Sequence, residues 1–197
     1  RLVGSEMCIR DSVNKGFTTK QWHAAVQMLR DNNLRVKTYL LFKPPFMSEG
    51  DALVHTTSWL TNVAQYSDEV SVNPMNIQKN TIVDRLFRNK EYRPPWLWSL
   101  VEMILRSHEH LGDESCRIIV HPTAGGKIRG AHNCGQCDSE VVAAIERYSV
   151  SGDTEEFSHL ECSCKSHWRA EIENDNSFPL PLGCLLYTSD AADDPYG

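Results

Sequence analysis

A repeated alternation of apolar runs with amphipathic segments constrains the fold of this chain more than any other feature of its sequence. Residues 36–42 are apolar and rich in β-forming types, and Pro44 and Pro45 stop the run. Similar short runs cover residues 69–73 and residues 117–121. Apolar runs of this length, closed by turn residues, are typical of strands buried on both faces of a parallel sheet.

Segments with one apolar side separate these runs and predict helices. The first begins at Thr18, which has the spacing of a capping box with Gln21. Its apolar positions recur at helical spacing, and they are Trp22, Ala25, Val26 and Leu29. This segment therefore predicts an amphipathic helix ahead of the first strand.

Further helices follow the same logic. Ser48 can cap the second helix, and residues 81–88 predict a short third one. Pro95 suits the first turn of a longer helix that Gly112 ends. The order of strands and helices predicts an α/β fold with a parallel sheet.

Three strand-like runs are few for an independent parallel domain. We therefore expect further strands upstream and interpret residues 13–122 as the carboxy-terminal part of an open or closed (β/α) barrel. From residue 123 the character changes to a glycine-rich loop, clustered cysteines and a helix near residues 139–148. Residues 123–183 are accordingly predicted to form a small, cysteine-rich metal module.

The two ends of the sequence look unlike the rest. Residues 1–12 and 184–197 lack periodicity and resemble translated sequencing-adaptor read-through, so we expect them to pack against nothing and to carry no function. A signal peptide does not fit the first stretch, which lacks an apolar core and contains Glu6, Arg10 and Asp11.

Charge and composition limit the classes of function. The chain has a net charge of −6; the last stretch contributes −3 and the first none, so residues 13–183 carry −3. A general basic footprint for nucleic acid is absent, and any such contact needs a local patch. No apolar run has the length of a membrane span.

Four cysteines form two close pairs that predict a metal site. Cys134 and Cys137 have CxxC spacing, and after 24 intervening residues Cys162 and Cys164 form a CxC pair. Four thiolates suit a tetrahedral, structural zinc ion, and their clustering without a secretory signal indicates a reducing compartment such as the cytoplasm. Either flanking histidine, His132 or His167, can replace one thiolate. The alternatives are unpaired buried cysteines or an iron–sulfur cluster.

Polar residues follow each predicted strand. In parallel α/β folds ligands bind beyond the carboxyl ends of the strands. Lys43, Asn73, Asn76 and His121 lie there and are the candidates for a cofactor or substrate pocket. A local role in capping loops is the alternative for each.

A second set of candidates is basic. Arg85, Arg88, Lys90 and Arg93 interleave with aromatic residues, a pattern that can bind RNA through phosphate contacts and stacking. The glycine-rich loop adds Lys127 and Arg129. Alternatively, the aromatic residues are core, the charges are solvated and the loop is a plain connector.

Four phrases together resemble one family. They are KTYLLFKPPF at residues 37–46, SVNPMNIQ at 71–78, EYRPPWLWS at 91–99 and RGAHNCGQC at 129–137. Over residues 14–168 the chain resembles the archaeosine-biosynthesis radical SAM proteins, which include the lyase (beta) subunit of archaeosine synthase and uncharacterised relatives. Ala131 stands where that family's phrase has proline.

The resemblance implies a partial (β/α) barrel that uses S-adenosylmethionine and a 4Fe-4S cluster. It implies a carbon–nitrogen lyase that converts a lysine-bearing 7-deazaguanine in tRNA to the formamidine, with a partner subunit. The cluster-binding CxxxCxxC motif is absent from this sequence. We therefore expect a fragment that is inactive alone. The alternatives are a radical SAM enzyme with a non-tRNA substrate and a non-catalytic, zinc-containing RNA-binding module.

Overall fold

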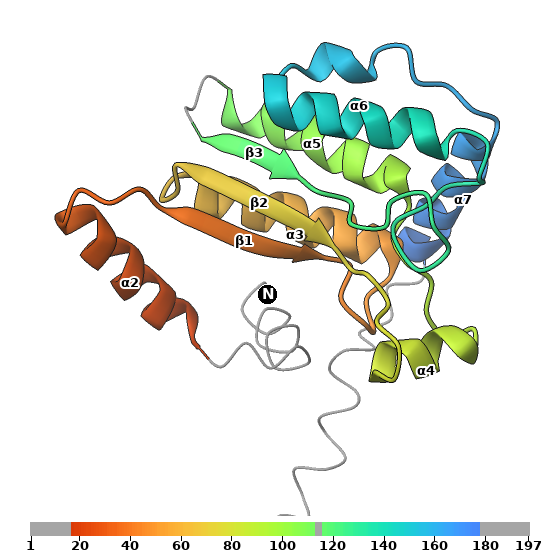
Figure 1. Cartoon of the computed structure of the whole chain (residues 1–197), viewed down its shortest axis with the longest axis horizontal. Coiled ribbons are helices and arrows are strands. Elements are labelled where there is room, and N and C mark those ends of the chain that lie inside the picture. Colours follow the sequence, from red (N-terminus) through yellow and green to blue (C-terminus); the bar gives the residue numbers. More distant parts are fainter. Residues whose placement is uncertain (1–16, 113–115, 178–197) are drawn as a thin grey trace, which may run out of the picture.

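Three parallel strands form the centre of the molecule. The computed structural model describes residues 17–112 and 116–177, so the predictions for residues 1–12 and 184–197 lie outside the described residues. Strands β1 (Lys37–Phe42), β2 (Glu69–Pro74) and β3 (Arg117–Val120) pair in the order β1-β2-β3 (Figure 1). The predicted α/β fold with a parallel sheet is confirmed; a closed barrel is not formed by the described strands.

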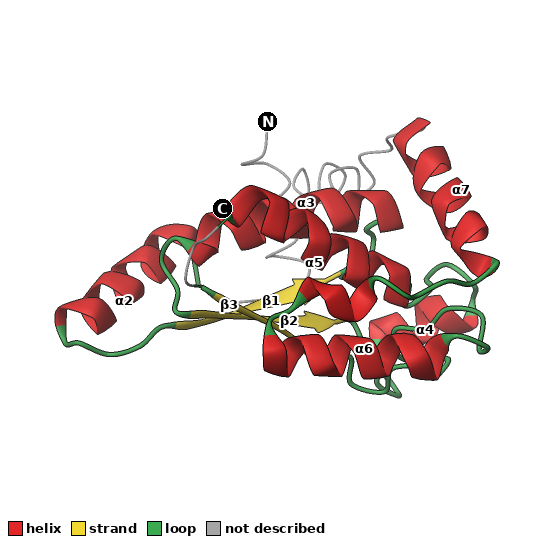
Figure 2. Cartoon of the chain, turned by 90° about the horizontal axis from the view of Figure 1, so that it is seen from above, coloured by secondary structure: helices red, strands yellow, loops and turns green. Residues whose placement is uncertain are grey.

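Helices connect and cover these strands. They are α2 (Thr19–Asp31), α3 (Glu49–Ala64), α4 (Ile82–Arg88), α5 (Leu97–Leu111), α6 (Asp138–Ser151) and α7 (Cys164–Ser177), with a 3-10 turn at Thr154–Phe157. Figure 2 shows α3 and α5 together on one side of the sheet. The capping box of Thr18 with Gln21 is present as predicted.

One main hydrophobic cluster joins the sheet to its helices. It includes Phe42 and Val72 from the strands, Ile104 from α5, Ile145 from α6 and Trp168 from α7. All five side chains are buried. The cluster thus contains residues from both sides of the boundary expected at residue 122.

The two edges of the sheet differ. At β3, the Ser149 hydroxyl accepts a hydrogen bond from the Val120 amide (3.0 Å) and donates one to the Val120 carbonyl (2.9 Å). Arg117 adds a bond to the Ser149 carbonyl (2.8 Å). Helix α6 therefore covers the outer edge of β3. The outer edge of β1 has no strand beside it among the described residues.

Some local expectations were wrong or incomplete. The helix expected to contain Pro95 begins only at Leu97, with Trp96 as its N-cap. In α2 only Val26 is buried; Trp22 and Leu29 are half-buried and Ala25 is exposed, so the predicted apolar stripe is only partly covered within the described part of the chain. The turn at 154–157 and helix α7 were not predicted, because neither has a strong apolar period.

Helix α5 depends on distant residues for its first turn. Trp96 makes no side-chain cap, and the carboxylate of Glu49 accepts a hydrogen bond from the Trp96 amide instead (2.9 Å). Asn133 likewise accepts one from the Trp98 amide (3.2 Å). The other oxygen of Glu49 pairs with the ammonium group of Lys43, and both side chains are buried. Unpaired amides at a helix start need such partners.

Replacing Glu49 with alanine should strongly destabilise the fold. The change leaves the Lys43 charge buried without its partner and removes the cap of α5, and breaking a buried pair costs about 3–5 kcal/mol. Urea unfolding should show this loss. Arg147→Ala, which breaks an exposed pair with Glu156, is the control and should barely move the midpoint. Equal effects of the two changes would contradict the role given to Glu49.

Candidate metal centre

The four clustered cysteines meet where the loop before α6 reaches the start of α7. Cys137 is the N-cap of α6 and Cys164 is the first residue of α7. All four sulfur atoms lie within 4.8 Å of one another. The Cys134–Cys162 and Cys137–Cys164 sulfur pairs are each 3.7 Å apart. The structure thus brings the predicted quartet together.

The spacing of these sulfurs suits one ion. Zinc–sulfur bonds of about 2.3 Å in a tetrahedron place the sulfurs about 3.8 Å apart. In a 4Fe-4S cluster each cysteine binds a different iron, which spreads the cysteine sulfurs further apart. The quartet could therefore hold a single metal ion such as zinc, and its geometry does not favour a 4Fe-4S cluster.

The histidines considered as substitute ligands stay outside the quartet. The ring of His132 hydrogen bonds to the Gly130 carbonyl through Nδ1 (2.9 Å), and His167 is exposed. Among the described residues, the group that could hold a metal ion consists of the four cysteines alone. Thiolate ligands alone leave zinc no open position, which is typical of a structural site.

Hydrogen-bond donors point at the sulfurs. The indole of Trp98 donates to Cys164 (3.2 Å), and the side-chain amide of Asn133 donates to Cys137 (3.3 Å). Backbone amides of Gln136 and Cys137 lower the pKa of Cys134 to about 7. Burial raises the pKa of Cys137 and Cys164 when no ion is bound. Donors of this kind orient and stabilise thiolate ligands.

A buried aspartate shapes the CxxC loop. The carboxylate of Asp138 accepts hydrogen bonds from the backbone amides of Asn133 (3.0 Å) and Gly135 (3.2 Å). Gly135 has φ +91°, a conformation that glycine adopts without strain. These hydrogen bonds therefore fix the conformation of the loop that carries Cys134 and Cys137 without the help of a bound ion.

Helix α7 ties the quartet to the main body. From this helix, Trp168 donates to the Ser99 hydroxyl (2.8 Å), and Glu171 accepts from the indole of Trp96 (2.8 Å). Further along, Asp175 accepts from the backbone amide of Gly50 (3.0 Å). The candidate metal centre is thereby connected to the first turns of both α3 and α5.

The four predicted pocket residues lie at the carboxyl edge of the sheet but in different settings. Lys43 is buried in its pair with Glu49. Asn73 and Asn76 are half-buried, and His121 is exposed. No hydrogen bond joins any two of these four among the described residues, so their role as a pocket stays a prediction.

The basic candidates divide into two groups. Arg88 and Arg129 both pair with the buried Asp84. Arg93 stacks on Trp96, 3.9 Å from the ring centre, and donates to the His132 carbonyl (2.9 Å). These three arginines thus have partners inside the protein.

The second group consists of Arg85, Lys90 and Lys127. All three are exposed, and their side chains make no ion pair or hydrogen bond in the described part of the chain. Most of the interleaved aromatics, in contrast, are core residues, since Tyr92, Trp96 and Trp98 are buried. Stacking of RNA bases on these three rings is therefore not available in this conformation.

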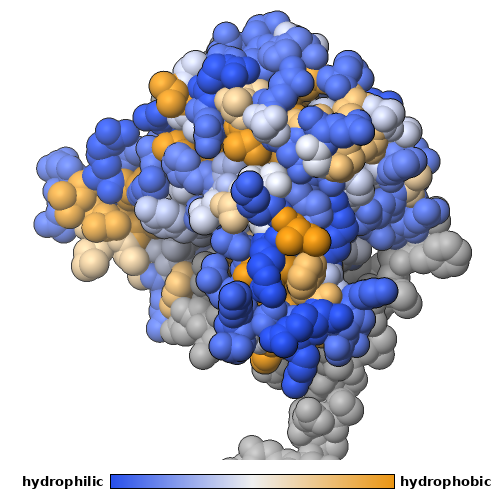
Figure 3. Space-filling model, turned by 45° about the vertical axis from the view of Figure 1, so that its right-hand side comes forward, coloured by the Kyte–Doolittle hydropathy of each residue, from blue (hydrophilic) through white to orange (hydrophobic). Residues whose placement is uncertain are grey.

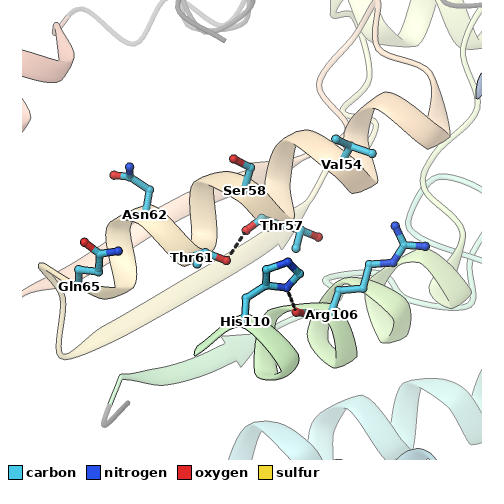
Figure 4. Close-up of a pocket in the computed structure, with 8 residues that line it drawn as sticks. All are labelled: Val54, Thr57, Ser58, Thr61, Asn62, Gln65, Arg106 and His110. Atoms are coloured by element: carbon cyan, nitrogen blue, oxygen red, sulfur yellow. Dashed lines mark hydrogen bonds between the residues drawn. The ribbon is translucent and has the colours of Figure 1, made fainter. Parts of the chain in front are cut away.

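A polar groove between α3 and α5 was not expected from the sequence. Figure 4 shows Thr57 from α3 facing Arg106 and His110 from α5. The Thr57 hydroxyl is buried and has no hydrogen-bond partner in the described structure, whereas Arg106 pairs with Glu102 (2.7 Å). Helical periodicity predicts that two helices pack together, but it does not show where their polar surfaces leave a groove.

Two similar proteins are named "Archaeosine synthase subunit beta". The one from Methanosarcina acetivorans is 36% identical over 181 residues, which cover 91% of this chain and 52% of the relative. The one from Thermococcus kodakarensis is 36% identical over 83% of this chain and 50% of the relative. An uncharacterised protein of Methanocaldococcus jannaschii is 32% identical over 87% of this chain and 47% of its own length.

The chain therefore spans about half the length of these curated relatives. No protein-family model matches it, and no solved structure matches it either. Within residues 17–112 and 116–177, no helix is both long and apolar enough to cross a bilayer.

The purified chain should contain about one zinc ion, held at about 2.3 Å by four sulfurs. Elemental analysis and X-ray absorption measure both quantities. Cys137→Ser should remove most of the metal and lower the melting temperature, because metal binding stabilises only the folded state. Cys116→Ser, which changes a cysteine outside the quartet, should keep the metal. Iron with sulfide in place of zinc would contradict the assignment.

Proposed function

We propose that this chain is the carboxy-terminal part of an archaeosine synthase subunit beta that acts in tRNA modification. The observation that carries the proposal is the 36% identity, over 91% of the chain, to a protein with that name. The quoted sequence phrases and the parallel sheet support the same family. As in the named relatives, a subunit of this kind implies a partner subunit.

The proposed reaction is the one that the family resemblance implies. The lysine-bearing 7-deazaguanine of tRNA is cleaved at a carbon–nitrogen bond and leaves the formamidine. S-adenosylmethionine and a 4Fe-4S cluster, when bound, would supply the radical chemistry. This sequence has no CxxxCxxC motif, and its one cysteine quartet suits a single ion. We therefore assign the cluster to the part of the intact protein that this chain does not cover.

The contribution of this chain is then positional. Residues 13–122 would complete a (β/α) barrel. The edge of β1 that has no strand beside it among the described residues is where a further strand of the intact protein can pair. Residues 123–183 would form the zinc-containing module, which is tied through Trp168, Glu171 and Asp175 to the first turns of α3 and α5. Helix α3 begins beyond the carboxyl edge of the sheet, after β1. In parallel α/β folds that edge is where ligands bind.

The test compares the intact protein with the isolated 197-residue chain. Supplied with its partner subunit and with tRNA that bears the lysine adduct, the intact protein should form the formamidine nucleoside, which mass spectrometry of digested tRNA detects. The isolated chain should not cleave S-adenosylmethionine even with iron, sulfide and a reductant. The missing cluster ligands are the reason.

Three other outcomes point elsewhere. Cleavage of S-adenosylmethionine by the isolated chain would contradict the assignment of the cluster to another part of the protein. An intact protein that cleaves the cofactor but leaves this tRNA unchanged would indicate a radical SAM enzyme with another substrate. An intact protein that binds RNA and zinc but never cleaves the cofactor would indicate a non-catalytic module.

A further inference from the structure

Positive charge is concentrated in one part of this acidic chain. Residues 79–93 and 127–129 contain seven lysines and arginines against two carboxylates, a net charge of +5. The chain as a whole has −6, so the remaining residues carry −11. Such a local excess attracts a polyanion while the rest of the surface repels it.

The two basic segments are neighbours in space because of Asp84. This buried carboxylate binds Arg88 of its own helix and Arg129 of the glycine-rich loop (2.9 Å). The amide of Ile77 also donates to the Arg129 carbonyl (2.8 Å), and the Arg129 guanidinium lies over the Phe87 ring. Helix α4 and the loop are therefore held as one unit.

Four cations in or beside this unit are exposed, and their side chains make no ion pair or hydrogen bond in the described structure. They are Lys79, Arg85, Lys90 and Lys127. We call the region that they occupy the α4 surface. Arg85 lines a hollow there together with Asn80, Thr81, Ile82, Arg88 and Asn89. Lys79 and Lys90 directly precede and follow the residues of this hollow in the sequence.

The backbone at Lys90 adds to this picture. Lys90 follows the last turn of α4 with φ +63°. Glycine is common at that position because other residues are strained there. A cation therefore lies beside the hollow in sequence, at a position where glycine would be less strained.

The α4 surface offers more than charge. Ile82 and Ile128 are 62% and 69% exposed, and Asn80 and Asn89, which carry side-chain amides, border the hollow. Figure 3 shows a largely hydrophilic surface over this part of the molecule, with small apolar spots. Cations for phosphates, amides for base edges and apolar side chains for base faces together suit unpaired nucleotides.

We infer that the α4 surface binds single-stranded RNA, with Arg85, Lys90 and Lys127 on the phosphates and a nucleotide in the hollow. The inference rests on the proposed function in that it names where the RNA substrate is held. Arg88 and Arg129 instead fix helix and loop through Asp84, so they are positioning residues.

The experiment measures binding of the chain to a fluorescent single-stranded RNA by anisotropy across a salt series. The patch variant carries Arg85→Ala, Lys90→Ala and Lys127→Ala. The control variant carries Lys20→Ala, Arg35→Ala and Arg169→Ala, which removes the same charge from exposed positions elsewhere. The patch variant should lose roughly tenfold or more in affinity, and its salt slope should fall by about 2, because each phosphate contact on a single strand contributes about 0.7. The control should bind nearly as the parent does.

Several results would overturn the inference. One is an equal loss in both variants, because it indicates only a general charge effect. Another is that the chain binds vesicles with anionic lipids and not RNA, and that the three patch substitutions abolish this vesicle binding. Thermal melting of each variant separates lost binding from lost folding.

The same substitutions in the intact protein separate this inference from the proposed function. If the intact protein with the three patch substitutions modifies tRNA as well as the parent does, the RNA-binding role of the α4 surface is wrong and the proposed function stands. If the intact parent protein does not modify tRNA but the chain still binds RNA through the α4 surface, the proposed function is wrong and the RNA-binding role of the surface stands.

Discussion

The first turn of α5 is the point on which the rest of the structure depends. Its free amides are satisfied by Glu49 from the start of α3 and by Asn133 from the cysteine loop. Glu49 is in turn neutralised by Lys43 at the end of β1. The start of α5 thus links the end of β1, the start of α3 and the cysteine loop. Loss of one of these parts leaves hydrogen-bonding or charged groups of the others without a partner.

The parts of the fold that local sequence determines could be predicted. Strands closed by proline and a capping box at Thr18 act over a few residues, and the structure contains both. The cysteine quartet was also predictable, because thiolate chemistry requires its members to meet. The start of α5 was missed by two residues, since its caps come from positions 47 and 35 residues away. Helix α7 was missed because its contacts, and not a strong apolar period, hold it in place.

The roles of single site residues were harder to predict than the helices and strands, because a charged side chain can be paired with a residue far away in the sequence. Lys43 stood out as a ligand candidate, but its partner Glu49 lies in the next helix and takes up its charge. Arg88 and Arg129 seemed equivalent to Arg85 and Lys127 in the sequence. The buried Asp84 separates them, and the paired arginines hold the pKa of that carboxyl well below its usual range. Such pairings depend on tertiary contacts that spacing alone does not reveal.

The contacts of α7 have a consequence for how the chain assembles. Asp175 binds the amide of Gly50 across 125 positions of sequence, and Glu171 reaches Trp96 across 75. On the ribosome the starts of α3 and α5 therefore emerge long before their last partners. The Gly50 amide and the Trp96 indole therefore lack these partners until α7 is synthesised, and the metal site can form only once Cys164 has joined the other three cysteines. The supply of metal in the cell would then set the moment at which folding is complete.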